Sequence, residues 1–235
     1  LEYERILNEE VRRRLGGVHS ADLILRSYDF AEIEALQQSG DWGAAGSRLA
    51  ADAARLERAG AEIVLLCTNT MHKLADSVKA AIGIPLLHIA DATGRSLQGD
   101  GVRRVALLGT RFTMEEDFYR KRLEDAYGLA VLTPDAEVRQ AVHRVIYDEL
   151  CLGVVSPDSR KVFLGIIDDL GAASDVVTRG LCHDGGLAAG DLDRTGFYPV
   201  VVAQALGGLA RAAQLRVAGD HLRQLDPGRT DGTRI

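Results

Sequence analysis

The apolar and polar positions of residues 1–170 fall into alternating helical and strand patterns. Short runs of Val, Ile and Leu followed by a polar turn predict buried strands, and longer runs with apolar residues every three or four positions predict helices. This alternation is typical of a parallel α/β fold. The predicted strands are residues 21–27, 62–67, 85–89 and 104–109, and the predicted helices are residues 1–15, 41–59, 71–81, one beginning near 91, 114–127, 135–150 and 156–170.

The pattern of strand, turn and helix begins a second time near residue 98, which predicts two α/β domains, residues 1–97 and 98–235. The chain opens in a helix, whereas a domain of this kind normally opens with a central strand. We therefore expect that the opening strand and its Gly-rich loop are missing. Residues 171–235 are rich in Gly, Ala, Arg and Asp and contain one strong apolar run, 198–203.

Composition and charge exclude several classes of function. With 46% hydrophobic residues the chain can build a core, and a net charge of −6 argues against nucleic acid as a partner. No apolar run is long enough to span a membrane and no signal pattern opens the chain, which predicts a cytoplasmic protein. Three widely spaced cysteines predict neither a disulfide framework nor a metal site. No nucleotide-binding glycine motif occurs.

The turn after strand 62–67 carries the clearest candidate chemistry, Cys67-Thr68-Asn69-Thr70. In open α/β sheets ligands bind outside the carboxyl ends of the strands, where these side chains are expected. Free N–H groups of the following helix would bind a substrate carboxylate and lower the pKa of the thiol. The alternative is that Cys67 is a buried strand residue and the polar residues only cap a helix.

Two further places carry candidate residues. Thr110 and Thr113 follow strand 104–109, in the equivalent position of the second half, and either hold a carboxylate or cap a helix. Cys182 stands beside His183 and Asp184, a set that also occurs in thiol hydrolases. Adjacent residues rarely face one another in catalytic geometry, so a hydrolase is the weaker hypothesis.

Five segments together resemble the aspartate/glutamate racemase family, and within it the broad-specificity amino-acid racemase branch. These segments are residues 15–21 (Leu-Gly-Gly-Val-His-Ser-Ala), 27–30 (Ser-Tyr-Asp-Phe), 66–73 (Leu-Cys-Thr-Asn-Thr-Met-His-Lys), 88–93 (His-Ile-Ala-Asp-Ala-Thr) and 108–114 (Leu-Gly-Thr-Arg-Phe-Thr-Met). The resemblance implies two pseudo-symmetric α/β domains with the active site in the cleft between them. It also implies a homodimer, an amino-acid substrate, and no cofactor, pyridoxal phosphate included.

The resemblance further implies a two-cysteine mechanism. Racemisation removes the α-proton from one face of an amino acid and returns one to the other, so two acid/base groups must flank the carbon. Cys67 and Cys182 would take these roles, one as thiolate and one as thiol. Donors for the substrate would come from six side chains, those of Ser27, Thr68, Asn69, Thr70, Thr110 and Thr113.

The second cysteine departs from the family pattern, in which it lies in a Gly-Cys-Thr-Glu turn after a strand. Here His183-Asp184 replaces Thr-Glu, and residues 175–179 are not predicted as a strand. The codons of residues 181–189, read one nucleotide later, can encode Cys-Ala-Thr-Thr-Glu followed by an apolar run. We therefore hypothesise a frameshift near residues 171–180.

Two alternatives to a racemase stay open. One is an impaired pseudoenzyme that binds an amino acid or a partner chain in the same cleft. The other is a related carbanion reaction, decarboxylation or isomerisation of a small dicarboxylic acid. An acidic substrate would require a fixed cation, for which the candidates are Arg26, Arg111, Arg160 and Lys161.

Overall fold

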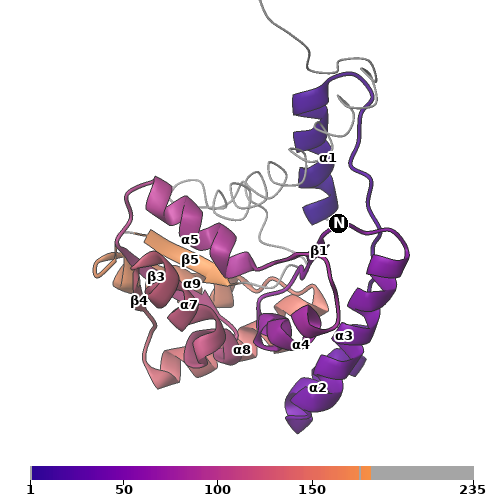
Figure 1. Cartoon of the computed structure of the whole chain (residues 1–235). Coiled ribbons are helices and arrows are strands. Elements are labelled where there is room, and N and C mark those ends of the chain that lie inside the picture. Colours follow the sequence, from indigo (N-terminus) through magenta and orange to yellow (C-terminus); the bar gives the residue numbers. More distant parts are fainter. Residues whose placement is uncertain (1, 175, 181–235) are drawn as a thin grey trace, which may run out of the picture.

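Helices flank two parallel sheets in the computed structural model, which describes residues 2–174 and 176–180 (Figure 1). The first sheet pairs β1 (Val64–Leu65) with β2 (Leu86–Leu87). The second has the order β4-β3-β5, from β4 (Ala130–Leu132), β3 (Arg104–Gly109) and β5 (Val176–Gly180). Every strand pair is parallel, which confirms the predicted α/β class.

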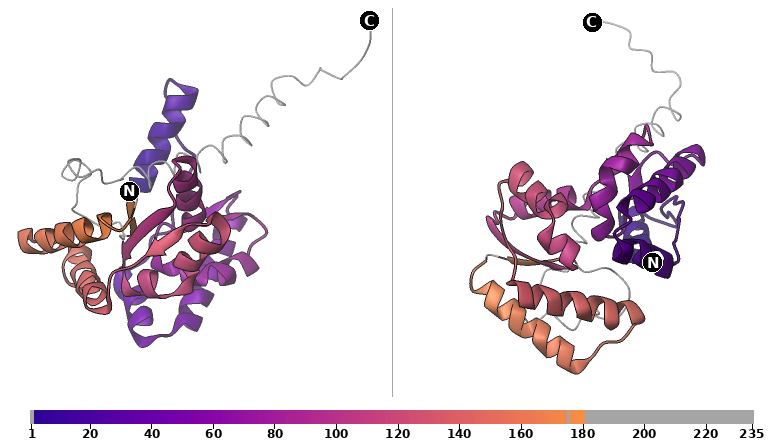
Figure 2. Two further views of the ribbon diagram at one scale, coloured as in Figure 1. Left: turned by 90° about the vertical axis from the view of Figure 1, so that its left-hand side faces the viewer. Right: turned by 90° about the horizontal axis from the view of Figure 1, so that it is seen from below.

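Strand β3 is buried on both faces because its side chains alternate between two cores. Val105 and Leu107 pack against α5 (Ile89–Gly99) and α7 (Asp117–Tyr127). Ala106 and Leu108 pack against the other pair of helices, α8 (Ala136–Asp148) and α9 (Pro157–Gly171). Figure 2 shows α8 and α9 together on one face of this sheet.

The first sheet is covered by the N-terminal helices. Buried side chains of α2 (Phe30–Ser39), α3 (Trp42–Arg58), the 3-10 helix η1 (Thr70–Leu74) and α4 (Ala75–Ala80) form one cluster, against which Leu66 and Leu86 pack. Leu65 and Leu87 pack on the other side, around Ala92, with Tyr3 and Ile6 of α1 (Glu2–Leu15). None of the described helices is long and apolar enough to cross a lipid bilayer.

The predicted helix starts agree closely with the structure where a polar residue caps the first turn. Asp41, Asp135 and Ser156 each accept hydrogen bonds from backbone N–H groups one turn into α3, α8 and α9. Proline at the first position of α9 suits the cap, since its missing N–H would have no partner there. The predicted strand 104–109 matches β3 in both bounds.

The predicted strand 21–27 is wrong. These residues form no regular secondary structure and pair with no strand in the described part of the chain, and Leu23, Ile24 and Leu25 are exposed. The predicted strand 62–67 shortens to β1, and 85–89 shortens to β2. An apolar run becomes a strand only where a partner supplies backbone hydrogen bonds, and those partners lie far away in sequence.

Two predicted helices are broken. Residues 71–81 fold as η1 followed by α4, and residues 114–127 divide into α6 (Arg111–Glu115) and α7 because Glu116 is extended. Helix α2 and strand β4 were not predicted. Residues 175–179 were not expected to form a strand, yet β5 pairs with β3 over five residues. Pairing with the buried strand β3 therefore outweighed the weak apolar pattern of this segment.

Candidate functional site

Cys67 lies exposed at the carboxyl end of the first sheet, two residues beyond β1. The protein atoms packed around its sulfur remove part of its hydration and raise the pKa of the thiol. The prediction of a lowered pKa is therefore wrong. Its assumed cause, the dipole of a helix at 71–81, is weak because η1 and α4 have only five and six residues.

Three of the predicted threonines meet at the boundary between the two sheets. The hydroxyl oxygens of Thr70 and Thr110 are 2.9 Å apart, and those of Thr110 and Thr113 are 3.1 Å apart. All three residues are at most 1% exposed. Thr110 also caps α6, accepting from the N–H of Thr113. The cluster thus joins the turn after β1 to the turn after β3, as expected for a site between two strand ends.

The turn that carries Cys67 is held by a buried histidine. The ring atom Nδ1 of His72 lies 2.7 Å from the carbonyl oxygen of Thr68. The backbone N–H of His72 donates to the carbonyl of Asn69 at 3.0 Å. Asn69 is itself buried. His72 is only 2% exposed, so its side chain holds the turn and does not face solvent.

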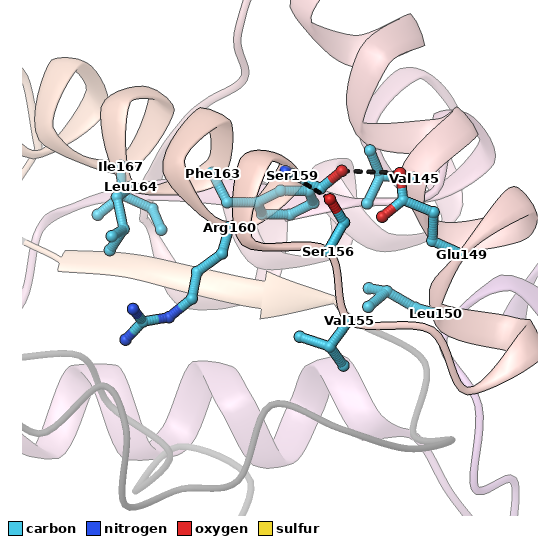
Figure 3. Close-up of a pocket in the computed structure, with 10 residues that line it drawn as sticks. All are labelled: Val145, Glu149, Leu150, Val155, Ser156, Ser159, Arg160, Phe163, Leu164 and Ile167. Atoms are coloured by element: carbon cyan, nitrogen blue, oxygen red, sulfur yellow. Dashed lines mark hydrogen bonds between the residues drawn. The ribbon is translucent and has the colours of Figure 1, made fainter.

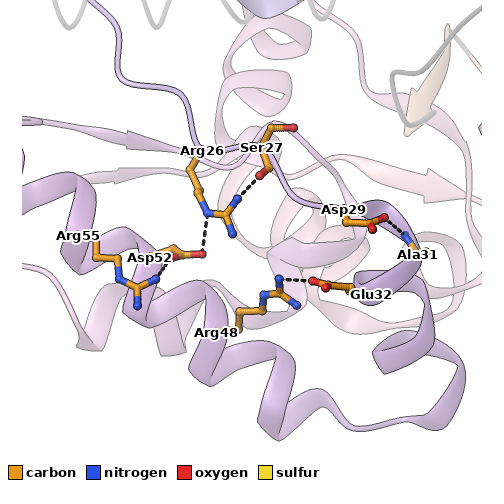
Figure 4. Close-up of polar contacts among 8 residues, drawn as sticks. All are labelled: Arg26, Ser27, Asp29, Ala31, Glu32, Arg48, Asp52 and Arg55. Carbon is orange, nitrogen blue, oxygen red and sulfur yellow. Dashed lines mark hydrogen bonds and ion pairs between the residues drawn. The ribbon is translucent and has the colours of Figure 1, made fainter.

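Ser27 lies on the exposed segment before α2, where the structure shows a charged network that the sequence did not predict (Figure 4). The guanidinium of Arg26 donates to the carbonyl of Ser27 and, at 3.2 Å, to the carboxylate of Asp52. Arg55 donates to the other Asp52 oxygen at 2.5 Å. The backbone carbonyl of Ser27 is thus connected to α3 through Arg26 and Asp52.

Asp52 is a charged residue that is only 3% exposed. Burial alone would raise its pKa, but hydrogen bonds from Arg55 and Tyr28 and the charge of Arg26 outweigh it, so the pKa of Asp52 is lowered. Burial together with the Asp52 carboxylate raises the pKa of Tyr28 to about 12. The sequence did hold a signal, since Asp52 occupies the apolar stripe of α3 between Leu49 and Ala53.

The four candidate cations for an acidic substrate are dispersed. Arg26 is paired with Asp52, and Lys161 with Asp158 at 3.3 Å. Arg160 lines a cavity on α9, and the Arg111 guanidinium lies 4.0 Å from Glu115 on the helix that follows Thr110. Arg111 is thus the candidate whose place in the chain directly adjoins the threonine cluster.

A small cavity opens between α8 and α9, away from the predicted site (Figure 3). Its lining is mostly apolar, with Glu149 at one side. One Glu149 carboxylate oxygen accepts from the Ser159 hydroxyl at 2.7 Å, and the other is buried without a partner in the described part of the chain. Cys151, next to this region, packs against the α8/α9 core.

Cys182 lies outside the described residues, whereas residues 171–174 and 176–180, where the frameshift is hypothesised, are described. Strand β5, which ends two residues before Cys182, is described, and its last residue Gly180 pairs with Gly109 at the end of β3. Among residues 2–174 and 176–180, no three His, Cys, Asp or Glu side chains lie close enough together to hold a metal ion.

The fold is that of a parallel α/β protein, and the candidate thiol and hydroxyl residues lie at the carboxyl ends of its strands. The family model described as Asp/Glu/Hydantoin racemase matches residues 1–178. The chain belongs to this family, as its motifs had indicated.

Relatives with known names or structures agree with that assignment. The broad specificity amino-acid racemase RacX of Bacillus subtilis is 30% identical over 94 residues, a match that spans 40% of this chain and 40% of that relative. A Yersinia pestis crystal structure assigned to the Asp/Glu racemases is 43% identical, with a TM-score of 0.78 over 91% of this chain and 93% of that one. An aspartate racemase homologue from Pyrococcus horikoshii is 30% identical, with a TM-score of 0.67 over 89% and 92%.

Proposed function

We propose that the protein is a cofactor-independent amino-acid racemase or epimerase in which Cys67 and Cys182 exchange protons with Cα. The observation that carries the proposal is the placement of Cys67. Its thiol is exposed at a strand end, in a turn joined by the Thr70–Thr110 contact to the end of β3. Parallel sheets place ligands at such strand ends.

The reaction balances without a redox partner. The Cys67 thiolate takes the Cα proton and becomes a thiol, the electron pair stays on the substrate as a carbanion, and the Cys182 thiol returns a proton to the opposite face. The two sulfurs have then exchanged protonation states, and the reverse reaction starts from there. A raised thiol pKa makes Cys67 a stronger base but leaves less thiolate at neutral pH.

The carbanion requires hydrogen-bond donors at the substrate carboxylate. The contacts among Thr70, Thr110 and Thr113 use two of their three hydroxyl hydrogens, which leaves one donor for another acceptor. Thr68 and Asn69 lie in the same turn as Cys67 and complete the proposed set with Ser27. The strand order supports the role of Cys182, since it follows β5, the neighbour of β3.

The pseudoenzyme hypothesis has an observation of its own in its favour. The threonine hydroxyls contact one another in a buried cluster, and the Cys67 pKa is raised, so the turn also suits binding without proton transfer. Incorporation of solvent deuterium at Cα of L- and D-amino acids separates the two. Exchange lost in both Cys67→Ser and Cys182→Ser supports the racemase, whereas binding without exchange in folded protein supports the pseudoenzyme.

The remaining expectations are also proposals. The domains at 1–97 and 98–235, the homodimer and the cytoplasmic location follow from the sequence and the family likeness. Light scattering of the purified chain tests the dimer directly, and a monomer at the concentration used for the exchange assay would contradict it.

A further inference from the structure

Both ring nitrogens of the buried His72 have defined partners. Nδ1 lies 2.7 Å from the carbonyl oxygen of Thr68, and Nε2 lies 3.1 Å from the backbone nitrogen of Ile89. A carbonyl oxygen only accepts and a backbone N–H only donates, so the ring must carry its proton on Nδ1 and accept at Nε2. This neutral tautomer satisfies both contacts.

These two bonds connect the ends of both strands of the first sheet. Thr68 directly follows Cys67 at the end of β1, and Ile89 opens α5 just after β2. The His72 ring also contacts the His88 ring, with centroids 4.3 Å apart. His88 is itself fixed, because its Nδ1 accepts from the N–H of Ala90 at 3.2 Å. The orientation of the His72 ring is therefore set from three sides.

We propose that His72 is a positioning residue for the Cys67 thiol, acting through its Nδ1–H bond to the Thr68 carbonyl. That bond fixes the Thr68–Asn69 peptide unit, one residue beyond Cys67, and so limits the directions in which the sulfur can face the substrate. The inference rests on the proposed function, because it assigns His72 a part in presenting the thiol as an acid/base.

A role for His72 as an acid or base itself does not fit the structure. Both nitrogens are engaged, the residue is 2% exposed, and burial lowers its pKa to about 4, so the ring is neutral at physiological pH. The ring therefore acts on the thiol only by fixing the position of the turn that carries it. Geometry matters here because a displacement of about 1 Å in a reacting group can cost on the order of 10²-fold in rate.

Two amide substitutions separate the two bonds. In His72→Asn the side-chain N–H2 takes the place of Nδ1 and keeps the bond to Thr68, while the bond to Ile89 is lost. In His72→Gln the longer side chain reaches the place of Nε2 and keeps the bond to Ile89, while the bond to Thr68 is lost. We expect kcat for Cα exchange to fall about tenfold to 10²-fold in His72→Gln and less than about threefold in His72→Asn, with KM little changed in both.

A second measurement does not depend on turnover. The rate of iodoacetamide alkylation of Cys67 is followed by peptide mass spectrometry, with Cys151 as the reference thiol in the same protein. A loosened turn hydrates the thiol, so alkylation at neutral pH is expected to be faster in His72→Gln and unchanged in His72→Asn. Leu123→Val, in the separate core formed by β3, α5 and α7, is the control for general destabilisation and should leave Cys67 alkylation unchanged.

The outcomes are distinct. Wild-type-like exchange and alkylation in folded His72→Gln overturn the proposal, as does a folded His72→Asn that is as impaired as His72→Gln. If wild type exchanges no amino acid, the proposed function fails, and the alkylation rates alone decide the positioning role. If His72→Gln does not fold, His72→Asn decides: exchange and alkylation at the wild-type rates support the proposal, and slower exchange or faster alkylation contradicts it.

Discussion

Two adjacent buried histidines are expected to make the protein lose stability in mild acid. His72 and His88 are 2% and 4% exposed, and each accepts a hydrogen bond from a backbone N–H that a protonated ring nitrogen could not accept. Burial lowers the pKa of His72 to about 4. Burial and the neighbouring His72 lower the pKa of His88 to about 3. Both rings are therefore neutral in the folded protein over most of the acidic range.

The sign follows from proton binding. The unfolded chain binds protons on both residues as the pH falls through their ordinary pKa of 6.5, whereas the folded protein does so only near 4 and 3. Stability from this source is complete above 6.5 and is lost below it. About pH 5 is about 1.5 pH units below the histidine pKa in the unfolded chain, and each unit stabilises the unfolded state by about 1.4 kcal/mol per histidine. The free energy of unfolding is therefore expected to fall by about 2 kcal/mol for each histidine and about 4 kcal/mol for both.

Urea unfolding followed by circular dichroism between about pH 7.5 and about pH 5 measures this loss. The control is the double variant His72→Asn/His88→Asn, in which Asn at position 88 can still cap α5. The control lacks both titrations and shares every other group, including the partly buried His143, whose pKa is also lowered. Equal losses of unfolding free energy in wild type and control would refute the reasoning.

Three other predictions concern packing, the cluster and the thiol. Gly94→Ala should lower the free energy of unfolding by about 1–3 kcal/mol, since a Cβ would meet the Tyr127 ring at 2.3 Å; an unchanged urea midpoint would contradict this. Thr110→Val should lower the free energy of unfolding by about 1–3 kcal/mol in the same assay, because it breaks the hydroxyl cluster; an unchanged free energy would show that the cluster does not stabilise the fold. Any Cα exchange should speed up as the pH rises from neutral toward the pKa of the Cys67 thiol, which burial raises above its ordinary value; a rate that falls over this range would exclude Cys67 as the base.

The sequence predicted best those features that depend on neighbouring residues. Strand β3 matched because its run is apolar on both faces, and the starts of α3 and α8 matched because each has an Asp cap. Residues 21–27 form no strand because nothing in the described chain pairs with them. Strand β5 forms for the opposite reason, since β3 supplies backbone partners that its own pattern does not reveal.

In the candidate site, too, features set by residues near in sequence could be predicted and those set by distant residues could not. The place of Cys67 at a strand end follows from the order of elements, and the contact of Thr70 with Thr110 follows from two strand ends facing one boundary. The pKa of Cys67 could not be predicted, because the packing around the sulfur depends on residues distant in sequence. The bond from His72 to Thr68 is local, but its second bond, to Ile89, crosses 17 residues.

The most direct test of the account is solvent deuterium incorporation at Cα, followed by NMR over a panel of L- and D-amino acids. Wild type is compared with Cys67→Ser and Cys182→Ser, and Cys151→Ser is the control for loss of a packing thiol. The account predicts exchange in wild type and Cys151→Ser that is lost in the other two variants. Undiminished exchange in folded Cys67→Ser would contradict it.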